Sequence, residues 1–263
     1  MLTEQQLAFF DVFGFFVAHE AFSSDEMATI IEQFGAALDD DRQGTAFSGE
    51  RRQGVLGFLE QREGLFPLLE DDRIFGSVEQ ILGPGFVWIG SDGNLYVGNT
   101  AWHPDNPTTY RRLKVAFYLD HVTKDSGCLR VIPGSHHPGY ADLLRQHPPR
   151  EDPAESPYGV AGSEIPAYPL ESCPGDVVFF NQALFHSSYG GRAGRRMFTL
   201  NFGSKPTSES HYDNLRRTYE GNVATTERLG STSRDRIYTD TFLRSESPRI
   251  QSMVAEIKTL GFR

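Results

Sequence analysis

The stretch Trp102-His103-Pro104-Asp105, together with the distant His186, constrains the architecture of this chain more than any other. His103 and Asp105 lie two positions apart, so in an extended segment both side chains point to the same face. Two imidazoles and one carboxylate can occupy one face of an octahedral metal ion and leave three positions open, which suits Fe(II) in oxygenases. Because His186 is so far along the chain, only a folded barrel or sandwich can bring it back to the pair.

Size and charge limit the class of protein. The chain has 263 residues, 23% charged and 38% hydrophobic, which is typical of a soluble globular protein with a sizeable core. A net charge of −10 argues against nucleic acid or an anionic membrane as a partner. No apolar run is long enough to span a bilayer, and the acidic start lacks the features of a secretory signal. We expect one domain over residues 1–263, a small-molecule substrate, and a monomer or homodimer.

The chain has only two cysteines, Cys128 and Cys173. This number excludes a disulfide framework and favours a reducing, cytoplasmic location. Both lie in strand-like segments, which predicts buried and unreactive thiols.

Short strands dominate the middle of the chain. Gly90-Ser91-Asp92-Gly93 is a strong turn signal that divides the first two of them, and the alternation after Arg112 predicts a half-buried strand. Many short strands joined by Gly- and Pro-bearing turns favour a jelly-roll barrel or sandwich. The expected strands are Phe86–Ile89, Asn94–Val97, Leu113–Leu119, Cys128–Ile132, Val177–Phe180 and Met197–Phe202. Apolar residues at helical spacing predict helices that pack outside the sheets, over residues 3–10, 23–40, 73–82 and 247–260.

Residues 147–169 interrupt the strands with a segment rich in Pro, Gly and acids. A loop of this length inside a compact domain is usually functional or disordered. Two interpretations stay open: a lid over the metal site, and a mobile surface insertion.

The context of His186 and a basic pair beyond it strengthen the metal-site hypothesis. His186 follows a Pro-Gly-Asp turn and four apolar residues, Val177–Phe180, that predict a strand ending near it. Arg195 and Arg196 begin another strand-like run. A guanidinium makes two parallel hydrogen bonds to a carboxylate. An iron oxygenase needs a two-electron reductant, commonly 2-oxoglutarate, whose far carboxylate requires such an anchor. The alternative for the pair is a solvated strand end.

These motifs resemble the phytanoyl-CoA dioxygenase family of Fe(II)- and 2-oxoglutarate-dependent oxygenases. Order and rough spacing agree over about residues 86–203, and the run from Gly127 to His136 is quite specific to the family. The matching stretches are Trp102-His103-Pro104-Asp105, Asp120 with Ser126-Gly127-Cys128-Leu129-Arg130-Val131-Ile132-Pro133-Gly134-Ser135-His136, Pro174–Phe180, His186-Ser187-Ser188 and Arg195-Arg196.

The resemblance implies a double-stranded β-helix, with flanking helices, that binds Fe(II) through His103, Asp105 and His186. It implies that Arg195 pairs with the 5-carboxylate of 2-oxoglutarate and that the hydroxyl of Ser188 assists. Because the loop after the distal histidine is shorter than in the family, Arg196 remains an alternative anchor. The reaction would consume O2 and hydroxylate a small metabolite or natural-product intermediate, with release of succinate and CO2. Related halogenases replace the carboxylate ligand with a small residue, so Asp105 favours hydroxylation over halogenation.

Several nearby residues have weaker assignments. His136 and His137 belong to a structural turn of the family pattern and are taken as non-ligands. Arg111, Arg112 and Lys114 are either strand-end charges or groups that reach a carboxylate of substrate or cosubstrate. Asn99 and Tyr96 are candidates to line the pocket. Residues 205–240, with the 147–169 segment and the N-terminal part, are expected to set substrate choice.

Two other functions are weighed against the oxygenase. One is a jelly-roll metalloenzyme that uses the same ligands without 2-oxoglutarate. The other is a non-catalytic jelly-roll binding module in which the triad is incidental. Desaturation, epoxidation and cyclisation share the chemistry of hydroxylation and are not separated by the sequence.

Overall fold

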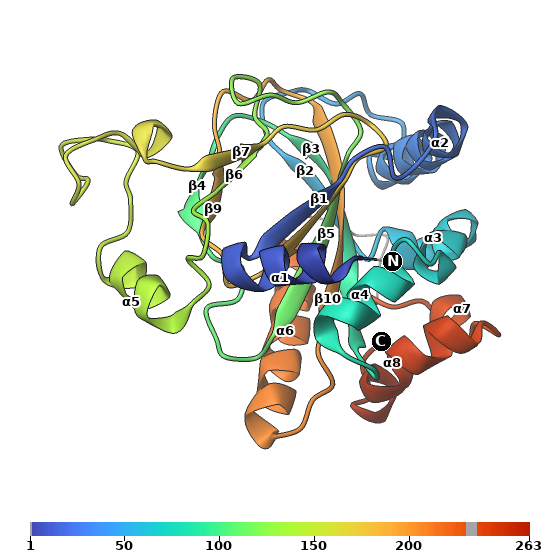
Figure 1. Ribbon diagram of the computed structural model, residues 1–263. Helices are drawn as coiled ribbons and strands as arrows, with labels where there is room; N and C mark the ends of the chain where they lie inside the picture. Colours follow the sequence, from blue (N-terminus) through green and yellow to red (C-terminus); the bar gives the residue numbers. More distant parts are fainter. Residues whose placement is uncertain (1, 230–235) are drawn as a thin grey trace.

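The computed structural model describes residues 2–229 and 236–263. Within these ranges the strands form a six-stranded sheet of order β1-β8-β5-β10-β3-β2 and a four-stranded sheet of order β4-β9-β6-β7. All paired strands are antiparallel. The strands are β1 (Phe15–Ala18), β2 (Gln53–Leu56), β3 (Val87–Tyr96), β4 (Thr100–His103), β5 (Arg112–Tyr118), β6 (Leu129–Val131), β7 (Tyr168–Leu170), β8 (Val177–Asn181), β9 (His186–Ser188) and β10 (Arg195–Gly203). The predicted jelly-roll fold is confirmed, with helices around the larger sheet (Figure 1).

The two sheets pack face to face around a small apolar cluster. Tyr118, Phe180 and Met197 of the large sheet meet Leu129 and Val131 of the small one. Side chains of a strand alternate between its two faces, so only every second residue of β5 and β10 reaches this interior.

Helices cover the outer face of the large sheet, except for α5, which lies in a lobe on the side of the small sheet (Figure 1). They are α1 (Glu4–Phe13), α2 (Ser24–Asp41), α3 (Phe66–Glu70), α4 (Phe75–Leu82), α5 (Pro138–Gln146), α6 (Glu209–Arg228), α7 (Asp240–Leu243) and α8 (Pro248–Thr259), with 3-10 turns at Leu59–Gln61, Glu63–Leu65 and Gly162–Glu164. The main hydrophobic cluster runs from Phe10 to Phe262 and joins these helices to β3, β5 and β10. At its centre the rings of Phe117 and Phe198 stack with centroids 4.5 Å apart. Truncating either ring to Ala would cost about 3–5 kcal/mol.

Helix α2 begins where the sequence predicted. The Ser23 side chain accepts from the backbone N–H of Glu26, and the Glu26 carboxylate accepts from the backbone N–H of Ser23, which completes a capping box. Arg73 donates to Glu26 at 2.6 Å and so ties the start of α2 to the segment before α4. No helix within the described ranges is both long and apolar enough to cross a membrane.

Three local expectations were wrong, and one helix was not predicted. The turn expected at Gly90–Gly93 is absent, because β3 runs unbroken between β10 and β2 and both neighbours satisfy its backbone. Strand β5 is buried on both faces, not half-buried, since helices cover one side and the small sheet covers the other. Helix α6 was missed because most of its residues are polar. Cys128 is buried, but Cys173 is exposed in a bend beside an isolated bridge.

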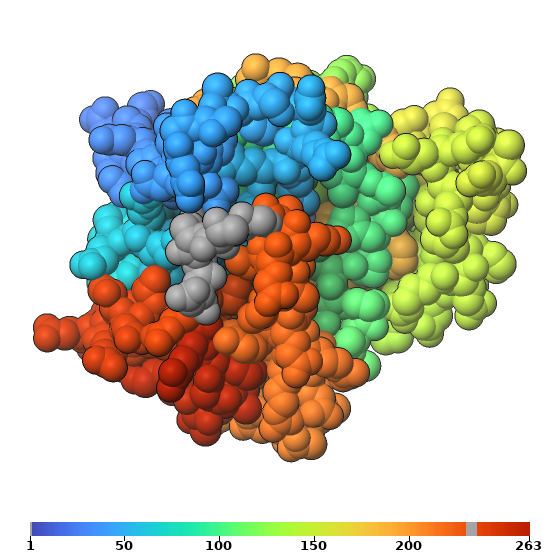
Figure 2. Space-filling view, turned by 180° about the vertical axis from the view of Figure 1, so that it is seen from behind, coloured from blue at the N-terminus to red at the C-terminus, as the bar shows by residue number. Residues whose placement is uncertain are grey.

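Residues 138–167 form a lobe that projects from the barrel (Figures 1 and 2). Residues 162 and 163 of this lobe are attached to the small sheet. Trp102 Nε1 donates to the Gly162 carbonyl at 2.8 Å, and Arg130 donates to the Ser163 carbonyl at 2.7 Å. None of the residues 147–169 lines the cavity that contains the metal motif. The lid hypothesis therefore gains no support from the position of this segment.

Candidate active site

The pairing of β4 with β9 brings the two ligand histidines together. His103 ends β4 and His186 begins β9, and the two residues are direct partners in the antiparallel register. Their ring centroids lie 4.4 Å apart. The Asp105 carboxylate completes the group, with Oδ1 3.6 Å from His103 Nε2 and Oδ2 3.6 Å from His186 Nε2. One ligand atom from each residue lies within 4.8 Å of the other two, which is the spacing of a metal site.

Hydrogen bonds orient both imidazoles toward the centre of this triad. His103 Nδ1 lies 2.8 Å from the Ala101 carbonyl, and His186 Nδ1 lies 2.9 Å from the Leu184 carbonyl. A carbonyl only accepts, so each Nδ1 carries a proton, and in the neutral imidazole each Nε2 presents a lone pair. This backbone support is typical of metal-binding histidines.

The loop after β4 is fixed by backbone and side-chain contacts that position Asp105. Asn106 N–H donates to the Gln182 carbonyl at 2.8 Å, and Asn106 Nδ2 donates to the Tyr110 carbonyl at 2.8 Å. Asn106 is itself buried. The Asp-Asn-Pro segment is thus a rigid support that holds the carboxylate beside the two histidines.

Electrostatics set the charge of each ligand group. Burial lowers the pKa of His186 to about 4, so its imidazole is neutral and free to bind a metal ion. Burial also opposes the charge on Asp105, but Lys114, His186 and His103 outweigh it and hold the pKa of Asp105 well below its usual range. For His103 burial is outweighed by the hydrogen bond and charge of Asp105, and its pKa is raised. The site is therefore one anionic and two nitrogen ligands, a donor set that fits Fe(II).

Lys114 supplies a positive charge that the sequence left unassigned. Its Nζ lies 2.8 Å from Asp105 Oδ2, and the side chain is mostly buried on the inner face of β5. Its neighbours Arg111 and Arg112 diverge, as alternation on a strand requires: Arg111 is exposed and paired with Asp11, and Arg112 is buried.

Arg195 lies at the opposite end of the same interior from α6, at the start of β10. It is 2% exposed, and its Nη2 donates to Ser188 Oγ at 3.0 Å, while Ser188 Oγ donates to the Gly127 carbonyl at 2.9 Å. Its Nε and Nη1 are buried without a hydrogen-bond partner among the described residues. An unpartnered buried guanidinium is costly, and a carboxylate is its natural complement.

Glycines make room for this guanidinium. A Cβ placed on Gly127 would overlap Arg195 Nη1, and one on Gly191 would overlap the same atom. Only residues without a side chain fit at these two positions, which explains the glycine in the Ser126-Gly127-Cys128 motif.

Arg196 points to the other face of β10 and is fully engaged. Its backbone N–H donates to Asp120 Oδ2 at 2.8 Å, and its Nη2 donates to Asp120 Oδ1 at 2.8 Å and to the Leu119 carbonyl at 3.0 Å. Of the two candidate anchors, only Arg195 faces the triad.

A cavity of about 370 Å³ contains the triad and Arg195. Its inner part is lined by the expected Tyr96 together with Tyr118, Leu129, Phe180 and Met197. Its outer wall comes from β2 and the residue before it, β3 and α6, and sequence reasoning expected residues 205–240 and the N-terminal part to contribute without naming these residues. This wall contains Arg52, Asp92, Asn94, Thr225 and Arg228. The signal for α6 was the recurrence of Tyr212, Leu215, Tyr219 and Val223 at helical spacing.

Three other candidates lie away from the triad. Asn99 accepts from the Gly190 N–H at 3.0 Å and does not line the cavity. The Nε2 atoms of His136 and His137 lie 3.2 and 3.1 Å from the carbonyls of Asp11 and Val12, so these histidines hold α1.

The fold and site define a jelly-roll protein with a two-histidine, one-carboxylate centre facing a buried arginine. The model of the phytanoyl-CoA dioxygenase (PhyH) family matches residues 10–197. The chain belongs to this family. No curated protein sequence matches the chain.

Solved structures share the fold at low sequence identity. HygX from Streptomyces hygroscopicus, with nickel and 2-oxoglutarate bound, is 18% identical, with 80% of this chain and 90% of that chain covered and a TM-score of 0.62. SnoK, a non-heme α-ketoglutarate-dependent carbocyclase of nogalamycin biosynthesis, is 16% identical. The match covers 77% of this chain and 84% of that chain, with a TM-score of 0.60. EctD from S. alaskensis with bound Fe is 22% identical, covering 77% of each chain, with a TM-score of 0.59.

Proposed function

We propose that the protein is an Fe(II)- and 2-oxoglutarate-dependent dioxygenase that hydroxylates a small metabolite or natural-product intermediate. The observation that carries this proposal is the buried Arg195, which lines the same cavity as the triad. Its Nε and Nη1 have no hydrogen-bond partner in the described part of the chain. Family membership and the metal and cosubstrate bound in HygX and EctD support it.

In this proposal His103, Asp105 and His186 hold the iron, and Arg195 with Ser188 binds the 5-carboxylate of 2-oxoglutarate. When bound, the iron and 2-oxoglutarate supply oxidation by dioxygen, in which one oxygen atom enters succinate, CO2 leaves and the other oxygen enters the substrate. The two histidines contribute neutral Nε2 lone pairs because their Nδ1 protons are donated to backbone carbonyls. Phe180, Leu129 and Met197 line the cavity with apolar surface that excludes water around the reacting groups.

Asp105 bears on the reaction type. A carboxylate at this position occupies the space that a halide would need, so we propose oxygen transfer and, among its outcomes, hydroxylation. The carbocyclase named among the structural neighbours makes cyclisation the second candidate. Mass spectrometry of the product distinguishes them, since hydroxylation adds one oxygen atom from labelled dioxygen and cyclisation adds none.

We also propose that the whole chain is one oxygenase domain in the cytoplasm. The main hydrophobic cluster contains residues from Phe10 near the start to Phe262 near the end, which supports one folding unit. Both cysteines are free thiols, which fits a reducing compartment. Residues 205–240 are proposed to contribute to substrate choice through α6; residues 230–235 of that range lie outside the described residues.

Anaerobic titration with Fe(II) and 2-oxoglutarate tests the proposal. We expect a weak visible charge-transfer band, followed by succinate formation when air is admitted. His186→Ala, which removes a nitrogen ligand, should abolish both signals. A protein that shows neither band nor succinate would be a binding module, and turnover of substrate without 2-oxoglutarate would indicate the other metalloenzyme.

A further inference from the structure

A second cavity continues from the metal triad toward α6. Its volume is about 390 Å³, and Asp92, Asp105 and Lys114 line both it and the first cavity. Lys114 and Arg112 line this cavity from the inner face of β5, and Asn201 lines it from the neighbouring strand β10. Helix α6 closes the other side, where it lies against the segment around residues 100–112 (Figure 2).

Arg112 is the buried cation of this second cavity. It is 8% exposed, and its Nη1 donates to Thr218 Oγ1 at 2.9 Å and to Asn214 Oδ1 at 3.4 Å. Its Nε is buried and has no hydrogen-bond partner among the residues that the structure describes. No carboxylate within the described ranges forms an ion pair with it. Burial lowers the pKa of Arg112 to about 10, and the charge of Asp105 offsets this effect only in part. Such a group is stabilised by an anion that enters the cavity.

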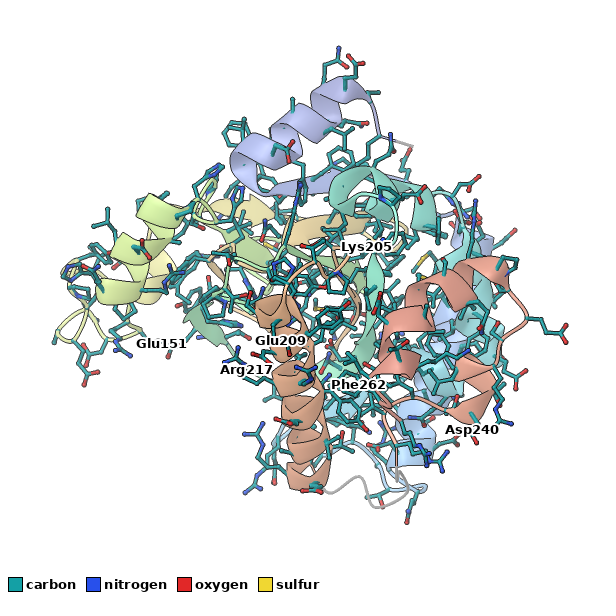
Figure 3. All side chains as sticks on the ribbon, turned by 90° about the horizontal axis from the view of Figure 1, so that it is seen from below. Glu151, Lys205, Glu209, Arg217, Asp240 and Phe262 are labelled. Atoms are coloured by element: carbon teal, nitrogen blue, oxygen red, sulfur yellow. The ribbon has the colours of Figure 1, made fainter. Side chains whose placement is uncertain are left out.

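None of the other charged residues in the described lining of this cavity forms an ion pair with Arg112. Lys114 is matched by Asp105 at 2.8 Å. Asp92 accepts hydrogen bonds from Thr199 and Asn94, at the end shared with the first cavity. Arg217 extends from the exposed side of α6 and adds a second guanidinium to the lining (Figure 3). Asn222 also lines this cavity, whereas the Nδ2 of Asn201 is engaged by the Gly90 carbonyl at 3.2 Å.

We propose that Arg112 binds a carboxylate of the primary substrate, with Arg217 drawing it in from the α6 side. Because Asp105 lines both cavities, a carboxylate held at Arg112 places the adjoining carbon atoms beside the metal triad, across from Arg195. One buried guanidinium matches the single charge of a carboxylate better than the double charge of a phosphate. This inference rests on the proposed function, because it names the class of substrate that the proposed oxygenase would bind.

Binding of hexanoate, measured by saturation-transfer NMR on the metal-free full-length protein, tests the assignment without knowledge of the true substrate. We expect hexanoate to bind and its neutral isostere hexanamide not to bind. Arg112→Gln should weaken hexanoate binding at least about tenfold, the loss expected for a charge-assisted hydrogen bond. Arg112→Lys, which keeps the charge without the fork, should fall between the two, and thermal unfolding checks that each variant is folded.

Three matched variants separate binding at Arg112 from binding elsewhere on the protein. Arg111→Gln changes the neighbouring exposed arginine and should leave hexanoate binding intact. Asn214→Ala removes a contact between Arg112 and α6 but no charge, so it should also retain binding. Arg195→Ala removes the other buried guanidinium and should retain hexanoate at Arg112.

The contrary results are distinct. Loss of hexanoate in Arg195→Ala with retention in Arg112→Gln would place the anion at the cosubstrate end and overturn the inference. Equal binding of hexanamide, no hexanoate binding by the wild type, or loss in Asn214→Ala would also overturn it, as would displacement by inorganic phosphate at lower concentration than by acetate. Succinate formation tests the proposed function separately: binding at Arg112 without turnover refutes only the oxygenase, and turnover without binding refutes only this inference.

Discussion

Lys114 Nζ lies 2.8 Å from Oδ2 of Asp105, the carboxylate that faces both ligand histidines. The metal site therefore contains a permanent cation as its neighbour. In the metal-free protein this ammonium compensates the partly exposed carboxylate, and a bound metal ion would take over part of that role. The relationship leads to a stability prediction that links the lysine to the metal.

Lys114→Met should destabilise the metal-free protein by about 1–2 kcal/mol, because it leaves a partly exposed carboxylate without its partner. Addition of Mn(II) should restore most of the loss, so the metal-induced shift in unfolding temperature should be larger in the variant than in the wild type. Lys124→Met is the control, since Lys124 pairs with Asp125 at the surface and its loss should be unmeasurable. Equal metal-induced shifts in Lys114→Met and wild type would contradict the pairing.

Arg195→Ala should raise the KM for 2-oxoglutarate on the order of 100-fold with a smaller effect on kcat, because it removes a charge-assisted pair. Steady-state succinate formation provides the measurement. Arg196→Ala removes the adjacent arginine, which binds Asp120 and not the cavity, and should leave this KM unchanged. The anchor assignment fails if Arg196→Ala has the larger effect.

Gly191→Ala should reproduce part of the Arg195→Ala phenotype without changing any charge. The added methyl group would overlap Arg195 Nη1 and must displace the guanidinium. We expect a raised KM for 2-oxoglutarate in the same succinate assay. Gly139→Ala, where a Cβ meets nothing within 4 Å, serves as the control. An unchanged KM in Gly191→Ala would mean that the position of the guanidinium does not affect cosubstrate binding.

Metal binding should release about one proton in the pH range just above the ordinary pKa of histidine, because metal ligands bind deprotonated. His103 is its source, since Asp105 raises the pKa of His103 despite burial, whereas His186, with a pKa of about 4, has already lost its proton. Calorimetric titration with Mn(II) in buffers of different ionisation enthalpy counts the protons. Release of two protons would show that His186 is also charged in the free protein.

Glu60→Gln should remove a pH dependence of stability that lies outside the site. Burial outweighs the hydrogen bonds from Ser91 and Trp88 and raises the pKa of Glu60 from 4.5 to about 7. Between these values the folded state holds a proton that the unfolded state has lost, so stability falls as pH rises, by about 3 kcal/mol in total. Denaturant unfolding at pH 5 and pH 8 should show this difference in the wild type and a much smaller one in Glu60→Gln. A wild-type stability that does not fall over this range would contradict it.

The chemistry of the site could be predicted from local patterns. His103 and Asp105 are two apart at the end of a strand, and the motif around Gly127 and the spacing of His186 indicate the family. Buried strands such as β8 and β10 could also be predicted from the sequence, because a short continuous apolar run is typical of a buried strand. These features can be recognised along the chain without knowledge of tertiary contacts, which is why the sequence alone predicts them.

Expectations failed where a long-range contact outweighs the local signal. Gly90-Ser91-Asp92-Gly93 favours a turn, yet β10 and β2 pair along both edges of β3 and keep it extended. Helix α6 has a polar sequence, and its place is set by contacts such as that of Thr218 with Arg112. Propensity is a weak prior that tertiary pairing overrides.

The sequence therefore contains the ligands and the family, but not the assignment of adjacent charges to opposite faces. Because side chains alternate along a strand, Arg195 and Arg196 must point in opposite directions, and so must Arg111 and Arg112. The sequence does not decide which arginine of each pair points inward. That phase is set by the register of β5, β10 and β3, which is established across the sheet and not along the chain. The same register places Lys114 beside Asp105 and Arg112 beneath α6, because strand pairing fixes the two faces of the sheet only once the barrel has closed.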